Sequence, residues 1–167
     1  MSRFTPYKVQ CFFSAFLFLF VFQSHAKESH TEIMVNAAGY AIHGYDPVSY
    51  FVQGEPKKGL RTHQYKWHGA TWLFGSKENK NLFMKSPEKY APQYGGWCAF
   101  GAADGYAAEP DPLTSWTIYK DKLYLNYNQS VLQQWGKDIP TFLEKAKTSW
   151  PQLSSELEAG TAKVYWK

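Results

Sequence analysis

The sequence predicts a small α+β domain with two antiparallel β-hairpins and several short helices. Alternating aromatic and polar residues at 63–74 and 116–127 are typical of hairpins. Between and after them lie short segments that begin at a Ser, Asn or Asp cap and end at Gly or Pro. Helices and antiparallel hairpins in this mixed order favour α+β over a parallel α/β sheet.

The composition is that of one globular domain. The chain has 167 residues, with 19% charged and 19% aromatic side chains. A disordered chain would be richer in charge and poorer in aromatics. No repeat of 20–50 residues is present, which excludes a solenoid.

Residues 1–26 have the pattern of a secretory signal peptide. Arg3 and Lys8 precede an apolar run at 11–22, and Ser24 and Ala26 are small residues two apart. The apolar run is too short to span a bilayer, which needs about 20 residues. We expect cleavage after Ala26, an exported protein, and no membrane association of the mature chain.

The mature chain is nearly neutral and has one cysteine. Without Arg3 and Lys8 it carries 16 basic against 14 acidic residues, too weak a bias for nucleic-acid binding. Cys98 remains as its single cysteine, so no internal disulfide can form even in an oxidising compartment.

The first elements follow from local signals. Residues 27–38 form a polar lead-in. Asp46 is a predicted helix cap, Pro47 suits the first helical position, and Gly54 ends that helix. In the hairpin at 63–74 the two-residue loop is His68-Gly69, where Gly accepts a positive φ. This register predicts three cross-strand pairs: Trp67 with Ala70, Tyr65 with Trp72, and His63 with Phe74.

The middle of the chain alternates short helices with loop. Ser76 caps a predicted helix over 77–85, with Leu82 and Phe83 facing inward. Ser86-Pro87 starts a further turn that carries Tyr90. Residues 91–113 are rich in Gly, Ala and Pro, and we expect mostly loop with one short helix near 96–103.

The second hairpin joins 116–119 to 122–127 through Lys120-Asp121, a poor pair for a primed turn. Asn128 caps a predicted helix over 129–135. Another helix begins at Pro140, continues to about Lys147, and is stopped by Pro151. Residues 152–167 are then a C-terminal tail.

Several short motifs together resemble the YHS domain family, particularly its secreted bacterial members. They occur in order as GYDPVSYF at 44–51, YxxHGxxWxFxS at 65–76, FxxSPEKY at 83–90, APQYGGWCAFG at 91–101 and LYLNYN at 123–128. The resemblance covers roughly 39–151. It implies a small domain related to treble-clef metal modules, a periplasmic location, and an association with heavy metals, chiefly copper.

The sequence departs from metal-binding YHS relatives at their cysteine positions. Ser49 follows Asp-Pro-Val, Gly75 lies between Phe and Ser, and Asn79 or a neighbour stands at the third position. Cysteine thiolates are the soft ligands that suit copper(I) or zinc. The usual ligand set is therefore absent.

Five residues remain as candidate metal ligands: Cys98, His43, Asp46, His63 and His68. Each has a structural alternative. Cys98 is either a ligand or a small buried hydrophobe. Asp46 also fits a helix cap, His68 a turn residue, His63 a packed residue of the hairpin, and His43 a loop residue.

The leading interpretation is non-catalytic binding of a metal ion, copper first and zinc possible, at a mixed site that includes Cys98. The alternative is a protein-interaction module with no metal and an unknown protein partner. The chain shows no hydrolase or phosphate-loop motif, so we expect no enzyme activity. The aromatic surplus has two interpretations, core packing or a pocket for a flat or apolar ligand such as haem.

Overall fold

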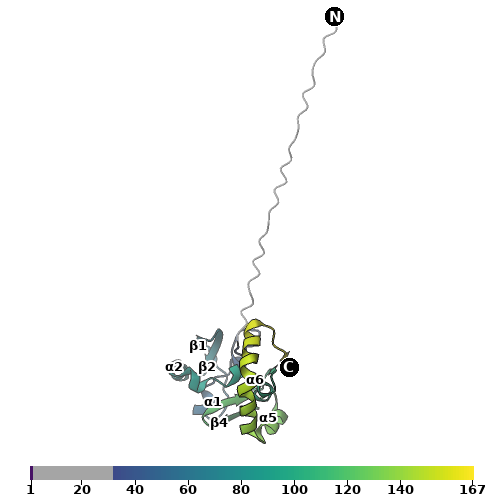
Figure 1. Cartoon of the computed structure of the whole chain (residues 1–167). Helices are drawn as coiled ribbons and strands as arrows, with labels where there is room; N and C mark the ends of the chain where they lie inside the picture. Colours follow the sequence, from purple (N-terminus) through teal and green to yellow (C-terminus); the bar gives the residue numbers. More distant parts are fainter. Residues whose placement is uncertain (2–31) are drawn as a thin grey trace.

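The computed structural model describes Met1 and residues 32–167, so the predicted signal peptide lies outside the described residues (Figure 1). The expected α+β fold is confirmed. The helices are α1 (Ser49–Val52), α2 (Lys77–Lys85), α3 (Pro87–Tyr90), α4 (Ala99–Ala103), α5 (Gln129–Gly136) and α6 (Ile139–Ala159), with single 3-10 turns at Ile42–Gly44 and Tyr94–Gly96. The strands are β1 (Leu60–Trp67), β2 (Ala70–Phe74), β3 (Ala107–Ala108), β4 (Trp116–Tyr119), β5 (Lys122–Leu125) and β6 (Val164–Tyr165).

Both predicted hairpins are present, and both have two-residue turns. The β1–β2 turn has positive φ at His68 and Gly69, and the β4–β5 turn has it at Lys120 and Asp121. Two successive positive φ values define the type I′ turn, whose twist matches that of the strands. Lys120 and Asp121 therefore adopt a type I′ turn, although Lys-Asp is a poor residue pair for that turn.

The β1–β2 register is confirmed near the turn and wrong further away. Trp67 pairs with Ala70 and Tyr65 with Trp72, as expected. Phe74 pairs with Leu60 and not with His63, because the register shifts between Leu60 and Gln64. Such an irregularity leaves extra residues of one strand unpaired. Cross-strand pairs beyond it therefore cannot be predicted by counting residues outward from the turn.

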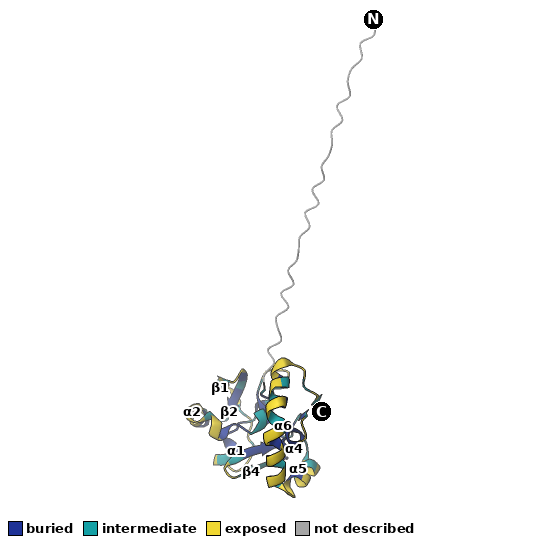
Figure 2. Ribbon diagram, in the orientation of Figure 1, coloured by how far each residue is buried: buried dark blue, intermediate teal, exposed yellow. Residues whose placement is uncertain are grey.

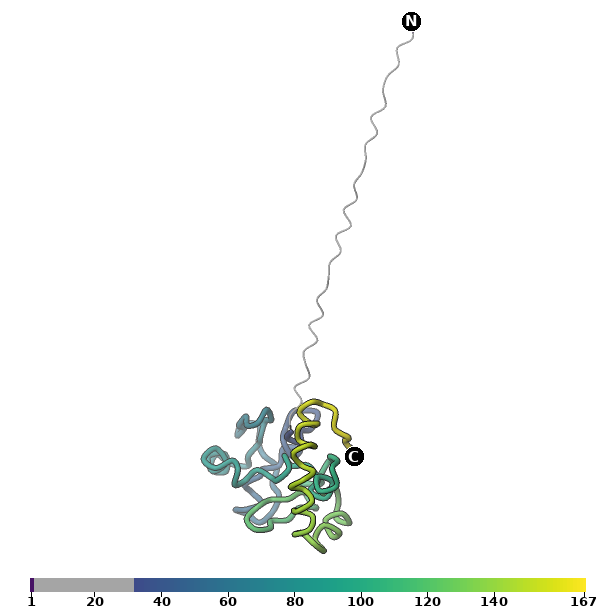
Figure 3. The backbone as a smooth tube through the Cα atoms, viewed as in Figure 1, coloured from purple at the N-terminus to yellow at the C-terminus, as the bar shows by residue number. Residues whose placement is uncertain are grey.

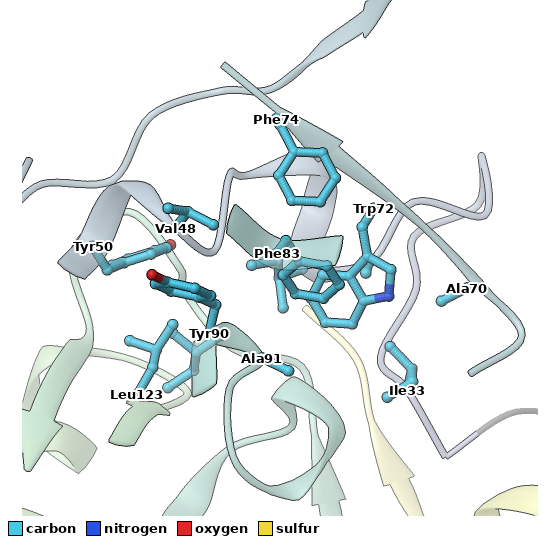
Figure 4. Close-up of a cluster of buried hydrophobic side chains, with 13 residues drawn as sticks. Ile33, Val48, Tyr50, Ala70, Trp72, Phe74, Phe83, Tyr90, Ala91 and Leu123 are labelled. Atoms are coloured by element: carbon cyan, nitrogen blue, oxygen red, sulfur yellow. The ribbon is translucent and has the colours of Figure 1, made fainter. Parts of the chain in front are cut away.

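The principal core lies between the β1–β2 hairpin, α1, α2 and the start of β5. Phe83 of α2 is completely buried, with its ring beside those of Phe74 and Trp72 (Figure 4). Leu82, expected to face inward with Phe83, lies 36% exposed. Residues 77–85 thus bury one narrow stripe, which suits a short helix at the edge of the domain.

Helix α6 packs against α4 on the other side of the molecule, and its outer face is exposed (Figure 2). The prediction that Pro151 ends this helix is wrong, since α6 continues to Ala159 and is capped by Gly160 with a φ of 70°. A proline inside a helix costs about 3 kcal/mol. Burial of Leu153 and Leu157 against Met34 and Trp97 offsets this cost.

Residues 152–167, predicted above as a C-terminal tail, contain the last part of α6 and the strand β6. After α6 the chain turns at Gly160, and β6 pairs in parallel with β3, joining Ala107 to Val164 and Ala108 to Tyr165. The tube in Figure 3 shows this last segment returning to the body of the molecule. Met34, in the predicted polar lead-in, is completely buried in the same region. No helix within residues 32–167 is long and apolar enough to cross a membrane.

Gly69 provides a test of the first turn. Its φ of 73° is strained for any residue with a Cβ, so Gly69→Ala should lower the free energy of unfolding by more than about 1 kcal/mol, and Gly69→Val by more. Chemical denaturation measures the change. Gly136→Ala is the matched control, because that glycine ends α5 with open space around it and should tolerate a Cβ. A Gly69→Val protein as stable as the wild type would contradict the turn assignment.

Candidate functional site

Asp46 lies completely buried between α1 and the start of α2. Its Oδ1 accepts a hydrogen bond from the Val48 amide at 2.9 Å. Its Oδ2 accepts from the Gly75 amide at 2.8 Å and from Asn79 Nδ2 at 2.6 Å. The carboxylate therefore joins the segment before α1 to the segment that links β2 and α2. Asp46 was expected to cap α1, but the N-cap of this helix is Val48 and no side chain caps it; Asp46 instead binds the amide of the N-cap residue and two groups near α2.

Ser49, Gly75 and Asn79, the residues that the sequence comparison above placed at or next to the cysteine positions of the resembled metal-binding domains, all contact Asp46. Besides Gly75 and Asn79, the Ser49 hydroxyl donates to the Asp46 carbonyl at 2.8 Å and accepts from the Lys57 amide at 3.1 Å. A Cβ at Gly75 would lie 3.4 Å from Asp46 Oδ2, an ordinary contact distance, so the amide of this residue rather than its small size is what the cluster uses. We call these four residues, Asp46, Ser49, Gly75 and Asn79, the Asp46 cluster. Its carboxylate is already satisfied by N–H donors and no soft ligand is present, so this set does not fit copper(I) or zinc.

Cys98 lies apart from the Asp46 cluster, at the N-terminus of α4. Its side chain is 1% exposed, its thiol donates to Asn126 Oδ1 at 3.6 Å, and its sulfur accepts from the Tyr127 amide at 3.3 Å. Burial raises the pKa of the Cys98 thiol, and nearby backbone N–H groups oppose this shift without cancelling it. The thiol is therefore neutral at neutral pH and a poor nucleophile.

A cavity of about 400 Å³ lies against Cys98. We call it the Cys98 cavity. Its walls come from four parts of the chain: the start of α4, β3 with the residue before it, the start of α5, and the C-terminal segment. The lining residues are Cys98, Tyr106, Ala108, Tyr127, Val131, Tyr165 and Trp166. Tyr165 and Trp166 are 44% and 58% exposed, so they form the outer rim.

A second, larger hollow of about 930 Å³ borders α3 and the β4–β5 turn. Apart from Phe51 and Pro87, the side chains around it are polar, and most are lysines or carboxylates at the surface. It contains none of the candidate ligands. The Cys98 cavity is the one of the two that has an apolar, aromatic lining, as binding sites for small molecules do.

His43 is connected to the wall of the Cys98 cavity through Glu109. His43 Nε2 lies 3.1 Å from Glu109 Oε1, and Glu109 Oε2 accepts from the Lys167 amide at 2.6 Å. Burial lowers the pKa of His43, and the opposing effect of Glu109 is smaller. The contact with Glu109 is therefore a hydrogen bond of a neutral imidazole near neutral pH, despite its ion-pair distance.

The other two histidines belong to the first hairpin. His63 Nδ1 is buried and has no hydrogen-bond partner within the described part of the chain. His68 lies in the β1–β2 turn, with Nδ1 3.2 Å from Glu32 Oε1 and its ring 4.1 Å from that of Trp67. Neither histidine is among the residues that line the Cys98 cavity.

The five predicted ligands do not form one site in the structure. Among residues 32–167, no group of three or more His, Cys, Asp or Glu side chains could hold a metal ion. Asp46 is in its own cluster, and His43 contacts Glu109. Sequence reasoning missed the aromatic lining of the Cys98 cavity, because Tyr165 and Trp166 fell in the predicted tail. The run Val164-Tyr165-Trp166 after Gly160 has the residue types of a strand, but it is too short to predict one by itself.

Comparison with known proteins identifies one domain. The model of the YHS domain family matches residues 48–94, which confirms a YHS domain within the longer segment that resembled this family. This range contains α1, the β1–β2 hairpin, α2, α3 and three members of the Asp46 cluster; Asp46 and Cys98 lie just outside it. No curated protein and no solved structure matches the chain.

The Asp46 cluster should dominate the stability of the domain. Asp46→Ala leaves the Gly75 amide and the Asn79 side chain as buried donors without an acceptor, so we expect a loss of at least about 3 kcal/mol in unfolding free energy. Asp46→Asn should also destabilise, because its amide group would face other donors. Chemical denaturation measures both. Glu55→Ala, which removes an exposed carboxylate, should change stability by less than about 0.5 kcal/mol.

His43 should make the fold sensitive to mild acid. Because the pKa of His43 is lower in the folded protein, the unfolded chain binds this proton more tightly. The contribution of His43 to the free energy of unfolding is therefore fully present above the usual pKa of 6.5, and it is lost as the pH falls through the folded pKa. We expect the wild type to lose more stability than His43→Asn between about pH 7.5 and about pH 5. Asn tolerates the φ of 57° at this position. His68→Asn, at another left-handed position, controls for the residue change; equal pH slopes for wild type and His43→Asn would refute the assignment.

Proposed function

We propose that this chain, which contains a YHS domain at residues 48–94, is an exported, non-catalytic binding protein whose site is the Cys98 cavity. The observation that carries the proposal is a cavity of about 400 Å³ with an apolar lining and a buried thiol in its wall. The ligand is a small organic molecule held by packing contacts. The predicted leader at 1–26 supports export, and the secreted bacterial resemblance supports the periplasm.

Three properties of the site support binding without catalysis. The volume lies within the range of about 300–1,000 Å³ that is typical of small-molecule sites. The Cys98 thiol is hydrogen-bonded to Asn126 and has a raised pKa, which disfavours attack on a ligand. No histidine is among the residues that line the cavity, so the described part of the chain places no imidazole base in its wall beside the thiol.

The proposal can be tested by filling the cavity. Val131 lines it from the first turn of α5, so Val131→Trp should occupy the space that a ligand needs. In an NMR titration of the mature chain, naphthol or decahydronaphthol should shift the amide signals of Ala108 and Tyr127. These shifts should disappear in Val131→Trp. Val52→Trp is the control, since that valine is exposed on α1 and distant in sequence from every lining residue.

Either probe binding equally well to Val131→Trp would show that the cavity is not the site. Absence of any shift with both probes in the wild type would overturn organic-ligand binding. A separate titration then decides between the two remaining functions, copper binding and metal-free protein interaction.

Copper(I) bound by Cys98 is the second candidate. The YHS domain belongs to a family associated with copper, and Cys98 is the only thiol within residues 32–167. A thiol must lose its proton to bind a metal, so the raised pKa of Cys98 should make copper(I) binding weaken as pH falls. Zinc, which takes four ligands, is less well served by a single thiol.

Cys98→Ser separates a ligand from a packed residue. If Cys98 binds copper(I), the substitution should weaken binding by about tenfold or more while the fold survives. If Cys98 is only packed, a hydroxyl in its place should cost about 1–3 kcal/mol of stability with no effect on copper. Native mass spectrometry and denaturation measure the two outcomes. Met84→Leu, which removes an exposed thioether, is the control. A wild type that binds neither copper(I) nor an organic probe would leave the metal-free interaction module.

A further inference from the structure

The Cys98 cavity, if it is the binding site proposed above, also indicates the class of its ligand. Four of its seven lining residues are aromatic: Tyr106, Tyr127, Tyr165 and Trp166. Aromatic linings serve two different ligand chemistries. Rings arranged as a cage bind a quaternary ammonium through cation–π attraction, whereas rings that expose faces and edges pack against a flat aromatic molecule.

Charges around the cavity disfavour a cationic ligand. Lys167 Nζ lies 5.0 Å from the centre of the Tyr127 ring, and Lys163 Nζ lies 4.9 Å from the centre of the Tyr165 ring. Two of the four rings therefore already attract an ammonium group of the protein. A positively charged ligand at the same rings would be repelled by these lysines.

Glu109, the carboxylate that binds the amide of Lys167, does not compensate for the lysines. Glu109 follows β3 and accepts from the Lys167 amide with one oxygen, while its other oxygen faces His43 Nε2. Its side chain is only 15% exposed. A cation in the cavity would have to compete with these contacts for Glu109.

The rings are held in place by contacts with one another and with Trp97, which lies outside the lining. Tyr165 meets Tyr106 edge to face, with 5.1 Å between ring centres, and Trp166 meets Trp97 at 5.5 Å in the same manner. Hydrogen bonds of the β3–β6 pair fix the backbone of this wall, from the Ala107 amide to the Lys163 carbonyl and from the Glu109 amide to the Tyr165 carbonyl. A wall that is ordered in advance loses less entropy when a flat ligand packs on it.

From these contacts we infer that the Cys98 cavity binds a flat aromatic molecule that carries no positive charge, with Trp166 as a contact residue. The rings supply the packing surface, the tyrosine hydroxyls supply polar groups near its edge, and the two lysines exclude cations.

Three probes of similar size test the inference by isothermal titration calorimetry on the mature chain. Naphthol is flat and neutral, decahydronaphthol has the same skeleton without aromaticity, and naphthylmethyl-trimethylammonium adds a positive charge. We expect naphthol to bind about tenfold more tightly than either of the others. Equal affinity for decahydronaphthol would show a merely apolar cavity, and tighter binding of the ammonium probe would show a cation cage. Either result would overturn the inferred ligand class, while the proposal that the cavity binds a small organic molecule would stand.

Trp166 offers a matched set of variants, because it is 58% exposed and its replacement should not unfold the protein. Trp166→Phe retains a ring and should bind naphthol nearly as well as the wild type. Trp166→Leu should bind naphthol about tenfold more weakly and decahydronaphthol unchanged. Leu113→Ala, another exposed apolar position outside the cavity, is the control. Failure of all three probes to bind the wild type would overturn the binding function itself along with its ligand class.

Discussion

The buried carboxylate of Asp46 is the interaction on which the domain depends. It accepts hydrogen bonds from the start of α1, from the residue after β2 and from the first turn of α2. A buried carboxylate without partners would cost several kcal/mol, so its position is favourable only because all three donors are fixed by the surrounding backbone. These hydrogen bonds thereby fix α2 against the β1–β2 hairpin, so that Phe83 of α2 and Trp72 of β2 pack together in the core.

This arrangement explains how a YHS domain can fold with other residues at the cysteine positions of its metal-binding relatives. Metal ligands in a small domain join separate segments of the chain. In this protein Ser49, Gly75 and Asn79 join such segments through hydrogen bonds to Asp46. The segments are thus linked without any soft ligand among these residues. Any metal chemistry of this chain must therefore depend on another part of the domain, where Cys98 is the only thiol among the described residues.

The local elements could be predicted from the sequence because their causes are local. His68-Gly69 sets the β1–β2 turn, and Ser76 and Asn128 accept the amide hydrogen bonds of the helices that follow them. The errors arose where distant contacts decide the structure. Pro151 is accommodated because Leu153 and Leu157 pack on Met34, more than a hundred residues earlier in the sequence. The pairing of β6 with β3 likewise involves two residues on each side, which is too short a pattern to identify from sequence.

The same distinction explains why the sequence singled out Cys98 but not the residues that surround it in the structure. Cys98 stands out in a sequence because of its residue type, but its environment is created by β3, α5 and the C-terminal segment. These segments supply tyrosines and a tryptophan rather than histidines and carboxylates, so they change the chemistry expected of the thiol. Cys98 lies beside aromatic rings, and burial raises the pKa of its thiol. A neutral, buried thiol of this kind acts as a small apolar group in the cavity wall more readily than as a metal ligand. The unusual residue in this chain therefore marks the position of the cavity, while the common aromatic residues around it determine the chemistry of its lining.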